Sequence, residues 1–481
     1  MSTIISSKKK AFIDGQFVDG VEGQYEAVIN PATEQVIAEV PVCSEEDVNL
    51  AVSAAERAFE SWGETTPAER SKALLKLADT IERKEEEFMK IESQNVGKPI
   101  EKVKGDISLT VDSLRFFAGA ARNLQGLSTG EYVENHTSMV RRDPMGVVGA
   151  ITPWNYPLLM TAWKIGPALA TGNTVVLKPS KLTPLSTLLL AELSTDIFPP
   201  GVINVVTGHA KPVGDAISHH PNIKMVSITG SVNAGKAVAQ AAVGTLKKVH
   251  LELGGKAPVI IFDDADISAA IQQIKIASFH NSGQDCTAAT RIYVSDKIYD
   301  RFLKELIPVI EGIQVGDPNS KSTEMGPLVS EAHLKGVKGF VDRATQNPGC
   351  EVLTGGVALE GSGFYYKPTV IVGAKQSDEI IQEEVFGPVI TVNQFTSDEE
   401  AIELANDSNY ALTASVWTHD LDRAMKVTKR LQYGAVWTNT HLTLTSEMPH
   451  GGSKLSGYGN DLSMYSLEEY TEIKHVMIKT Q

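Results

Sequence analysis

Residues 147–180 read VVGAITPWNYPLLMTAWKIGPALATGNTVVLKPS and decide the fold class of this chain. A short apolar run (147–152) is followed by a helix-like stretch (160–172) and then by a second apolar, β-branched run (174–180). The same alternation continues to about residue 255. Short buried strands that alternate with helices predict a parallel sheet with helices on both faces, which is an α/β fold.

The segments on either side extend this prediction. Residues 11–20 alternate between two turn signals and predict a short hairpin. A second α/β series runs from about residue 257 to 447. The late segment 466–480 predicts a strand that reaches beyond the body, and with 128–142 it is a candidate for a sheet between subunits. Helical spacing precedes the core in three stretches, the middle one long enough for two helices: 44–62, 66–97 and 106–124.

The length, composition and net charge of the chain limit which classes of protein it can belong to. The 481 residues are 42% hydrophobic, which suffices for a large core and exceeds one typical domain, so we expect two or three lobes. The formal net charge of −15 disfavours nucleic acid and anionic membranes as partners. No apolar run approaches the ~20 residues that cross a bilayer, and the N-terminal stretch lacks the apolar core of a secretory signal. We therefore predict a cytoplasmic protein.

The three cysteines are sparse and scattered. Cys43, Cys286 and Cys350 form no CxxC pair, and no zinc-ligand spacing is present, so we predict a reducing compartment and no metal site. Cys286 ends the stretch NSGQDC (281–286), which places it in a turn after Gly283 and before small residues. A catalytic thiol needs such partial exposure, whereas a buried thiol is the ordinary fate of a free cysteine, and this stretch alone leaves both open. Cys43 and Cys350 are interpreted as structural or incidental.

Two further polar residues lie at strand ends. Glu252, in LELGGKAP (251–258), follows an apolar strand and precedes two glycines, so its carboxylate could take a proton in a cleft. Asn155, between Pro153 and Pro157, could donate its amide to an oxyanion. The alternatives are a surface glutamate and an ordinary turn asparagine.

The sequence also contains candidate cofactor contacts. It has no GxGxxG fingerprint after a strand, but Gly230 and Ser231 stand where a strand meets a helix whose free amides could hold a diphosphate. The following GK lacks the P-loop pattern, which disfavours ATP. Lys178 ends a strand and could reach ribose hydroxyls, while Glu384 and Phe386 offer a carboxylate and a ring for a flat cofactor.

Together these stretches resemble the aldehyde dehydrogenase superfamily along essentially the whole chain. The matching blocks occur in order: INPATEQVIAEV (29–40), ITPWNYPL (151–158), VVLKPS (175–180), ITGSVNAGK (228–236), LELGGKAP (251–258), NSGQDCTAATR (281–291), EEVFGPV (383–389) and PHGGSKLSGYG (449–459). The resemblance implies an NAD(P)-binding variant Rossmann domain, an α/β catalytic domain and a small β oligomerisation domain that builds homodimers or homotetramers. The implied boundaries are 1–118 with 141–251, then 252–447, then 119–140 with 448–481.

The resemblance also implies roles. Cys286 resembles the nucleophile, Glu252 the general base, and Asn155 with the Cys286 amide the oxyanion hole. The thiol would add to an aldehyde, a hydride would leave to the nicotinamide, and water would hydrolyse the thioester to a carboxylic acid. Lys178 belongs to both the catalytic and the cofactor sets. The positions that match cofactor contacts are Thr152, Trp154, Lys178, Ser180, Lys181, Gly214, Gly230, Ser231, Leu253, Glu384 and Phe386.

Within the superfamily the closest resemblance is to the aminoaldehyde branch, and to bacterial γ-aminobutyraldehyde dehydrogenases in particular. It rests on VDSLRFFAGAAR (111–122), GQDCTAATR (283–291) and HLTLTSEMPHGG (441–452), and it implies oxidation of 4-aminobutanal to 4-aminobutanoate. Because a cationic amine needs carboxylates or aromatic faces, the candidate substrate contacts are Asp106, Asp112, Tyr156, Trp163 and Trp437. Alternatively, the tryptophans are core residues and the aspartates are solvated.

Three other functions stay open at this point. Betaine aldehyde and plain aliphatic aldehydes are alternative substrates, and a cysteine hydrolase is the alternative of another class. The cofactor is also open, because Lys181 stands where NAD-preferring relatives usually have a glutamate. A lysine cannot accept hydrogen bonds from ribose hydroxyls but can pair with a 2′-phosphate, so NADP is a candidate beside NAD; the alternative is that Lys181 points into solvent.

Overall fold

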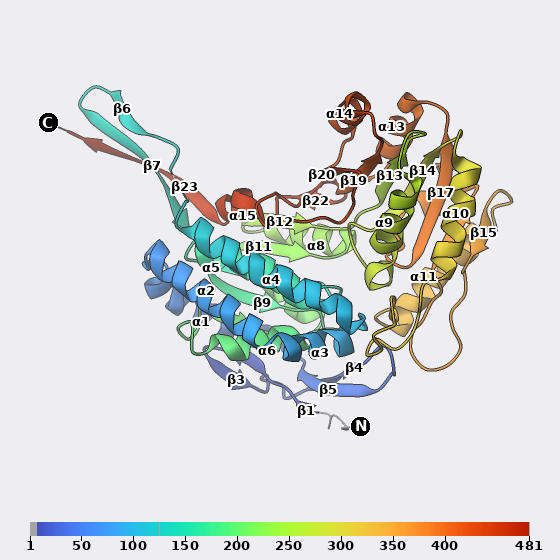
Figure 1. Cartoon of the computed structure of the whole chain (residues 1–481). Coiled ribbons are helices and arrows are strands. Elements are labelled where there is room, and N and C mark those ends of the chain that lie inside the picture. Colours follow the sequence, from blue (N-terminus) through green and yellow to red (C-terminus); the bar gives the residue numbers. More distant parts are fainter. Residues whose placement is uncertain (1–6, 125, 481) are drawn as a thin grey trace.

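The structure, a computed structural model, describes residues 7–124 and 126–480. Parts of the implied first and third domains fall on residues 1–6, 125 and 481, which lie outside the described residues. The chain forms two α/β bodies side by side, and a narrow β arm projects from one of them (Figure 1). This arrangement confirms the predicted α/β fold class.

The first body is built on an eight-stranded sheet whose centre is parallel. The predicted hairpin forms one edge of the sheet in antiparallel orientation, and a short late strand forms the other edge. In sheet order the strands are β22 (Gly457–Tyr458), β12 (Lys248–Glu252), β11 (Ile223–Thr229), β8 (Val147–Ile151), β9 (Thr174–Lys178), β10 (Ile203–Val205), β2 (Ala11–Ile13) and β3 (Gln16–Val18).

Alternate strand residues of this sheet enter two different cores. Val148 and Leu177 pack into one apolar core, while Val147 and Val176 pack into the other. Because side chains alternate across a strand, both faces must be covered by helices. One face carries α5 (Pro157–Ala170) and α6 (Leu185–Ser194), with α2 (Pro67–Arg83), α3 (Glu85–Val96) and α4 (Ile100–Ala121) outside them; the other carries α1 (Glu45–Trp62), α7 (Asp215–His219) and α8 (Val232–Val243).

The predicted helices before the core are confirmed, and their starts have local causes. Ser44 precedes α1 and forms a capping box with Asp47, while Thr66 precedes α2 and forms one with Glu69. In each pair the hydroxyl accepts from the amide of the third helical residue and the carboxylate accepts from the cap amide. The region 66–97 is two helices, as predicted.

The second body is a seven-stranded sheet, parallel except at one edge. In sheet order its strands are β15 (Glu351–Thr354), β16 (Thr369–Val372), β17 (Val389–Phe395), β14 (Ala289–Ser295), β13 (Ala257–Ile261), β19 (Thr413–Trp417) and β20 (Ala435–Thr438). Its helices are α9 (Ile267–Phe279), α10 (Tyr299–Glu311), α11 (Glu331–Ala344), α12 (Glu379–Gln382), α13 (Asp398–Asn406) and α14 (Leu421–Arg430). The predicted second α/β series is therefore confirmed.

Three small sheets complete the described residues, and the two larger of them have three strands each. Near the N-terminus, β1 (Ser7–Lys8), β5 (Val36–Pro41) and β4 (Tyr25–Ile29) form one of them. The arm is the other, made by β23 (Thr471–Lys479), β7 (His136–Pro144) and β6 (Thr129–Val133). The predicted late strand is confirmed, since β23 pairs with β7 along its whole length (Figure 1).

The strands of the arm differ from the implied boundaries of a β domain. β7 continues past residue 140 to Pro144, and the segment 448–470 lies on the two bodies instead of in the arm. In that segment β21 (Ser453–Lys454) pairs with β18 (Tyr410–Ala411), and α15 (Ser463–Glu469) contacts α4 and α5. Alternating apolar residues alone do not reveal which partner strand a short segment chooses.

Among the helices of residues 7–124 and 126–480, none is both long and apolar enough to cross a membrane.

A buried ion pair ties the late segment to the first body. The ammonium of Lys164 on α5 lies 2.7 Å from a carboxylate oxygen of Asp461, and both side chains are fully buried. His250 is close to the same carboxylate, but burial lowers the pKa of its imidazole to about 3, so Lys164 is the cation that balances Asp461.

We expect Asp461→Asn to destabilise the protein, because it leaves the Lys164 charge buried without a counterion. Breaking such a pair from one side costs about 3–5 kcal/mol of unfolding free energy. Glu87→Gln is the matched control, since the Lys84–Glu87 pair is half-exposed and worth little. Thermal unfolding should show a clearly lower Tm for the first variant alone; equal Tm values would contradict the assignment.

Candidate active site

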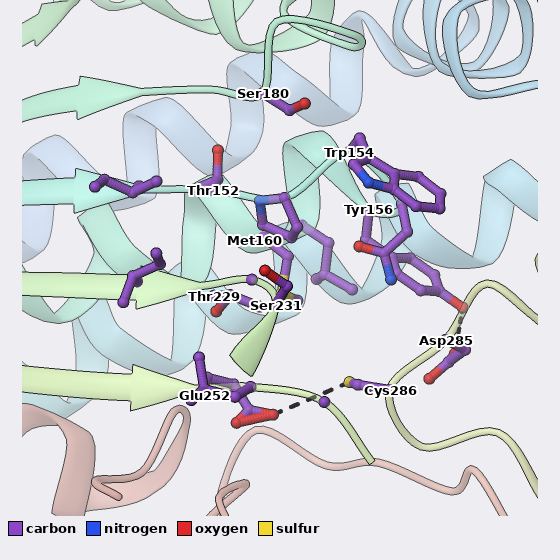
Figure 2. Close-up of a pocket in the computed structure, with 18 of the residues that line it drawn as sticks. Thr152, Trp154, Tyr156, Met160, Ser180, Thr229, Ser231, Glu252, Asp285 and Cys286 are labelled. Atoms are coloured by element: carbon purple, nitrogen blue, oxygen red, sulfur yellow. Dashed lines mark hydrogen bonds between the residues drawn. The ribbon is translucent and has the colours of Figure 1, made fainter. Parts of the chain in front are cut away.

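A cavity of about 1030 Å³ lies between the two bodies. Its walls come from the carboxyl ends of the first body's parallel strands and from loops of the second body (Figure 2). Ligands of open α/β sheets bind at this edge.

The register of the sheet gathers four predicted or neighbouring polar residues at one edge. Ile151 is level with Lys178 and Thr229 is level with Glu252 in the parallel ladders. Thr152, one residue beyond β8, therefore lies in the same row as these strand ends. All four polar side chains line the cavity.

One half of the cavity fits a dinucleotide. Ser231 caps α8, and its hydroxyl accepts from the amide of Ala234 at 3.2 Å, so Gly230 and the first turn of the helix present an anion-binding end. The hydroxyls of Thr152 and Thr229 are buried without a hydrogen-bond partner among the described residues. Lys178 donates to two backbone carbonyls, at 3.0 and 3.1 Å, which leaves its third N–H for a ligand.

Most of the other predicted cofactor positions also line the cavity. Glu384 accepts from the amide of Gly255 at 2.8 Å, and burial raises its pKa to about 7. Phe386 packs edge-on against Trp154, with ring centroids 5.2 Å apart. The remaining lining residues of the predicted set are Ser180, Lys181 and Leu253.

The prediction that Gly214 contacts the cofactor needs correction, because this residue does not line the cavity. It is buried behind Lys178, whose Cε would lie 3.6 Å from a Cβ at this position. The residues of this segment that reach the cavity are His209, Ala210 and Lys211, just upstream of it. The helical turn over Ala210–Gly214 rotates its last residue toward the interior.

The turn that carries Cys286 is strained. Asn281, Ser282 and Gly283 all have positive φ, at 49°, 59° and 70°. A Cβ on Gly283 would lie 2.2 Å from the carbonyl oxygen of Gly387, so only glycine fits. The prediction that Gly283 permits an unusual backbone shape is confirmed.

Cys286 and Glu252 face one another, as the dashed line in Figure 2 shows, with Sγ 4.0 Å from Oε1. Burial raises the pKa of Glu252. Burial and the charges of Glu252 and Asp285 raise the pKa of the Cys286 thiol well above its ordinary value. The thiol is therefore protonated at neutral pH, with a buried carboxylate beside it that can take its proton.

The glycine pair after Glu252 makes this approach possible. A Cβ on Gly255 would lie 2.0 Å from the carbonyl oxygen of Cys286, and one on Gly254 would lie 2.4 Å from a carboxylate oxygen of Glu384. A larger residue at Gly255 would force the cysteine turn away from the end of β12, whereas one at Gly254 would displace the carboxylate of Glu384.

Asn155 is held beside the same turn. Its side-chain amide donates to the backbone carbonyl of Gln284 at 3.0 Å. The backbone carbonyl of Asn155 in turn accepts from the side-chain amide of Asn281 at 3.0 Å. One amide hydrogen of Asn155 stays available, and the residue lines the cavity with Cys286.

Three of the five predicted substrate contacts line the cavity, namely Asp106, Tyr156 and Trp163. Asp112 is a correction: six residues after Asp106 on α4, it is turned by about 240° around the helix axis, and it accepts from the hydroxyl of Ser446 at 2.6 Å. Trp437 is a second correction. It lies on the edge strand β20, outside the cavity lining, and its indole donates to a backbone carbonyl at 2.9 Å.

Asp106 is already neutralised by a lysine. The buried ammonium of Lys98 forms an ion pair with it and lies 3.6 Å from the ring centroid of Tyr156. The sequence pattern did not indicate this partner, because Lys98 precedes the helix in a turn.

Asp285 is the carboxylate that sequence reasoning missed. It accepts from the Tyr156 hydroxyl at 2.5 Å and from the amide and hydroxyl of Thr287 at 2.8 and 2.6 Å (Figure 2). Burial raises its pKa, but these hydrogen bonds outweigh burial and lower it overall, so Asp285 is ionised. No Lys or Arg pairs with it among the described residues. Its signal was its place directly before Cys286.

His450 is a second missed residue. Its Nε2 lies 3.4 Å from Oε1 of Glu252, and its ring packs on Trp163 at 5.3 Å between centroids. Burial lowers the pKa of His450, but the bond to Glu252 outweighs burial, so the pKa is raised. His450 belongs to the sequence block 449–459. The two glycines that follow it were the only sign in the sequence that its backbone lies close to other parts of the chain.

Comparison with known proteins identifies the family of the chain. The family model described as "Aldehyde dehydrogenase family" matches residues 17–476. Betaine aldehyde dehydrogenase of Bacillus subtilis is 41% identical over 477 residues, covering 98% of this chain and 97% of that protein. Human retinaldehyde dehydrogenase 3 is 40% identical, with 98% and 93% covered. The chain belongs to the aldehyde dehydrogenase family, an oxidoreductase family.

A solved structure agrees. Betaine aldehyde dehydrogenase from Staphylococcus aureus, in complex with NAD+, has a TM-score of 0.96 at 38% identity, covering 98% of this chain and 95% of that one. The two curated relatives are named for different aldehydes at nearly equal identity. Family membership therefore establishes an aldehyde dehydrogenase and leaves the substrate to be argued from the site.

We expect Cys286 to be alkylated by iodoacetamide with a pH midpoint above the ~8.5 of an ordinary thiol, because only the thiolate reacts. Glu252→Gln removes a neighbouring negative charge and should move this midpoint to lower pH. Glu403→Gln, on an exposed helix far from the cavity, is the control. Peptide mass spectrometry separates Cys286 from Cys43 and Cys350; an unshifted midpoint would disprove the electrostatic argument.

Proposed function

We propose that this chain oxidises 4-aminobutanal to 4-aminobutanoate with NAD+. The observation that carries the proposal is Asp285, an ionised carboxylate that pairs with no lysine or arginine among the described residues, next to Cys286 in the same cavity. An ammonium group on the substrate would supply the missing positive charge. Tyr156 already has the Lys98 ammonium 3.6 Å from its ring centroid, so of the two predicted aromatic contacts that line the cavity, Trp163 is the one left to offer a face to a cation.

The chain's own residues account for the covalent steps. Glu252 takes the thiol proton, and Sγ of Cys286 adds to the aldehyde carbon to form a thiohemiacetal. The free amide hydrogen of Asn155 and the Cys286 backbone N–H stabilise the negative oxygen. After loss of a hydride the product is a thioester. Glu252 gives the thiol proton to solvent, then removes a proton from the attacking water and returns it to the departing sulfur, which releases the acid and the thiol.

NAD+ supplies the hydride acceptor when it is bound. The residues that would hold it are those whose free donors and acceptors face the other half of the cavity: Thr152, Lys178, Gly230, Ser231, Glu384 and Phe386. The solved relative that contains NAD+ supports this cofactor.

The alternative substrates and the cysteine hydrolase account for fewer features of the cavity than oxidation of an aminoaldehyde does. Betaine aldehyde has a quaternary ammonium that cannot donate a hydrogen bond, so Asp285 would act through charge alone. A plain aliphatic aldehyde would use the apolar wall of Leu109, Met160 and Leu444 and leave Asp285 without a cation. A cysteine hydrolase would leave the half of the cavity that fits a dinucleotide unused.

The arm supports association between copies of this chain, as a homodimer or homotetramer. Ile473, Met477 and Ile478 are 67%, 46% and 49% exposed on β23, which is more apolar surface than a free strand ordinarily presents.

We expect the highest kcat/KM for 4-aminobutanal when it is compared with 3-aminopropanal, betaine aldehyde and butanal, each with NAD+ and NADP+, and no cofactor reduction by Cys286→Ala. Asp285→Asn should lower kcat/KM for 4-aminobutanal by about 10- to 100-fold, the worth of one hydrogen bond to a charged group. Butanal should lose much less, because it has no ammonium.

Asp112→Asn is the matched control, since Asp112 is a carboxylate outside the cavity. Equal losses for 4-aminobutanal and butanal in Asp285→Asn would remove the argument for an aminoaldehyde while keeping aldehyde oxidation. A best rate with butanal would do the same, and no reduction of either cofactor by any aldehyde would refute the function as a whole.

The exposed Lys181 lines the cofactor half of the cavity beside Ser180. We expect Lys181→Glu to raise the ratio of kcat/KM for NAD+ over NADP+, because a carboxylate accepts from ribose hydroxyls and repels a 2′-phosphate. Lys236→Glu, which makes the same charge change outside the cavity, is the control. An unchanged ratio would show that Lys181 points into solvent.

A further inference from the structure

Three different metal-ligand atoms converge in the cavity. Sγ of Cys286, a carboxylate oxygen of Glu252 and a ring nitrogen of His450 all lie within 4.8 Å of one another. The Sγ–Oε1 distance is 4.0 Å and the Nε2–Oε1 distance is 3.4 Å. The three residues come from distant parts of the chain, so no ligand spacing was visible in the sequence.

These distances are close to those of a tetrahedral zinc site. With Zn–S near 2.3 Å and Zn–N or Zn–O near 2.1 Å, tetrahedral angles separate sulfur from oxygen by about 3.6 Å and nitrogen from oxygen by about 3.4 Å. The nitrogen–oxygen edge is therefore already in place. Sγ of Cys286 must approach Oε1 of Glu252 by a few tenths of an ångström and the ring nitrogen of His450 by up to about 1 Å, because that nitrogen and the sulfur lie within 4.8 Å and a tetrahedral site sets them about 3.6 Å apart. One Cys, one His and one carboxylate are ligand types that zinc takes.

Unpartnered atoms point to the same conclusion. Oε2 of Glu252 and Nδ1 of His450 are buried without a hydrogen-bond partner among residues 7–124 and 126–480, although their side chains are only 1% and 4% exposed. A carboxylate with one uncommitted oxygen can turn to coordinate a cation. Glu252, Asp285 and Glu384 also make the surroundings of the thiol negative, which favours a divalent cation there.

We propose that Cys286, Glu252 and His450 form an inhibitory site for Zn²⁺, with the fourth position open to water from the cavity. Coordination replaces the thiol proton, which is released to solvent, so the affinity rises with pH. The bound ion occupies the nucleophile and the base together. The binding stands on the geometry alone, whereas the inhibition rests on the proposed function.

Cobalt(II) is the probe, because a thiolate–cobalt charge-transfer absorption reports sulfur ligation directly, and Zn²⁺ then displaces it. The variants are Cys286→Ala and His450→Gln. The matched control is His280→Gln, which removes another imidazole of the same cavity that is not one of the three ligands. The full-length protein is titrated without substrate or cofactor, and aldehyde oxidation is followed separately with added Zn²⁺ and then with EDTA.

We expect one site in the wild type, no charge-transfer absorption in Cys286→Ala, and binding at least tenfold weaker in His450→Gln but unchanged in His280→Gln. Zn²⁺ should abolish aldehyde oxidation reversibly. X-ray absorption of the wild-type zinc complex, with one sulfur and the remaining ligands nitrogen or oxygen, tests the site even if a variant does not fold.

Wild-type affinity in His450→Gln, or a zinc complex without sulfur, would overturn the site. Zinc bound at the site without loss of oxidation would overturn the inhibition. If no aldehyde is oxidised at all, the cobalt titration still decides the site, so failure of the proposed function and failure of the metal site are distinguishable.

Discussion

The parallel register of the eight-stranded sheet is the constraint on which the site depends. Because the strands run in one direction, their carboxyl ends meet in one row, and the register levels Lys178 with Ile151 and Glu252 with Thr229. The buried faces of the sheet hold this row in place, since β8, β9 and β11 each pack into two cores. A slip of one residue would turn every one of these side chains to the other face.

The second constraint is the close contact between the cysteine turn and the end of β12. Gly255 and Gly283 admit backbone approaches that leave no space for a Cβ, and the turn is held in a left-handed conformation. This strain brings the thiol into a buried and negative setting, which raises its pKa. Two carboxylates contribute to this shift, namely Glu252, whose Oε1 lies 4.0 Å from Sγ, and Asp285, the residue before the cysteine. The protonation state of the Cys286 thiol is therefore controlled by its burial and by neighbouring carboxylates.

Much of this could be predicted from local pattern. Alternating apolar runs predicted both α/β bodies, and the capping residues Ser44 and Thr66 set the starts of two helices. The glycines that flank Cys286 and Glu252 marked both residues as candidates, and the resemblance to a family implied their roles. Asp112 and Trp437 could not be excluded, because helix phase and strand position decide whether a side chain reaches a cavity, and sequence proximity to a motif does not report either. The prediction of a cofactor contact at Gly214 was wrong for the same reason, because the sequence does not report which residues of that turn face the cavity.

The sequence by itself determined the fold class and the family, because these depend on local periodicity and on short contiguous blocks. Only the tertiary structure decided which charges are already balanced: Lys98 neutralises Asp106, whereas Asp285 has no lysine or arginine beside it among the described residues. It also decided that His450 lies against Glu252. Such partners are separated widely along the chain, and only the packing of the two bodies brings them within a few ångströms.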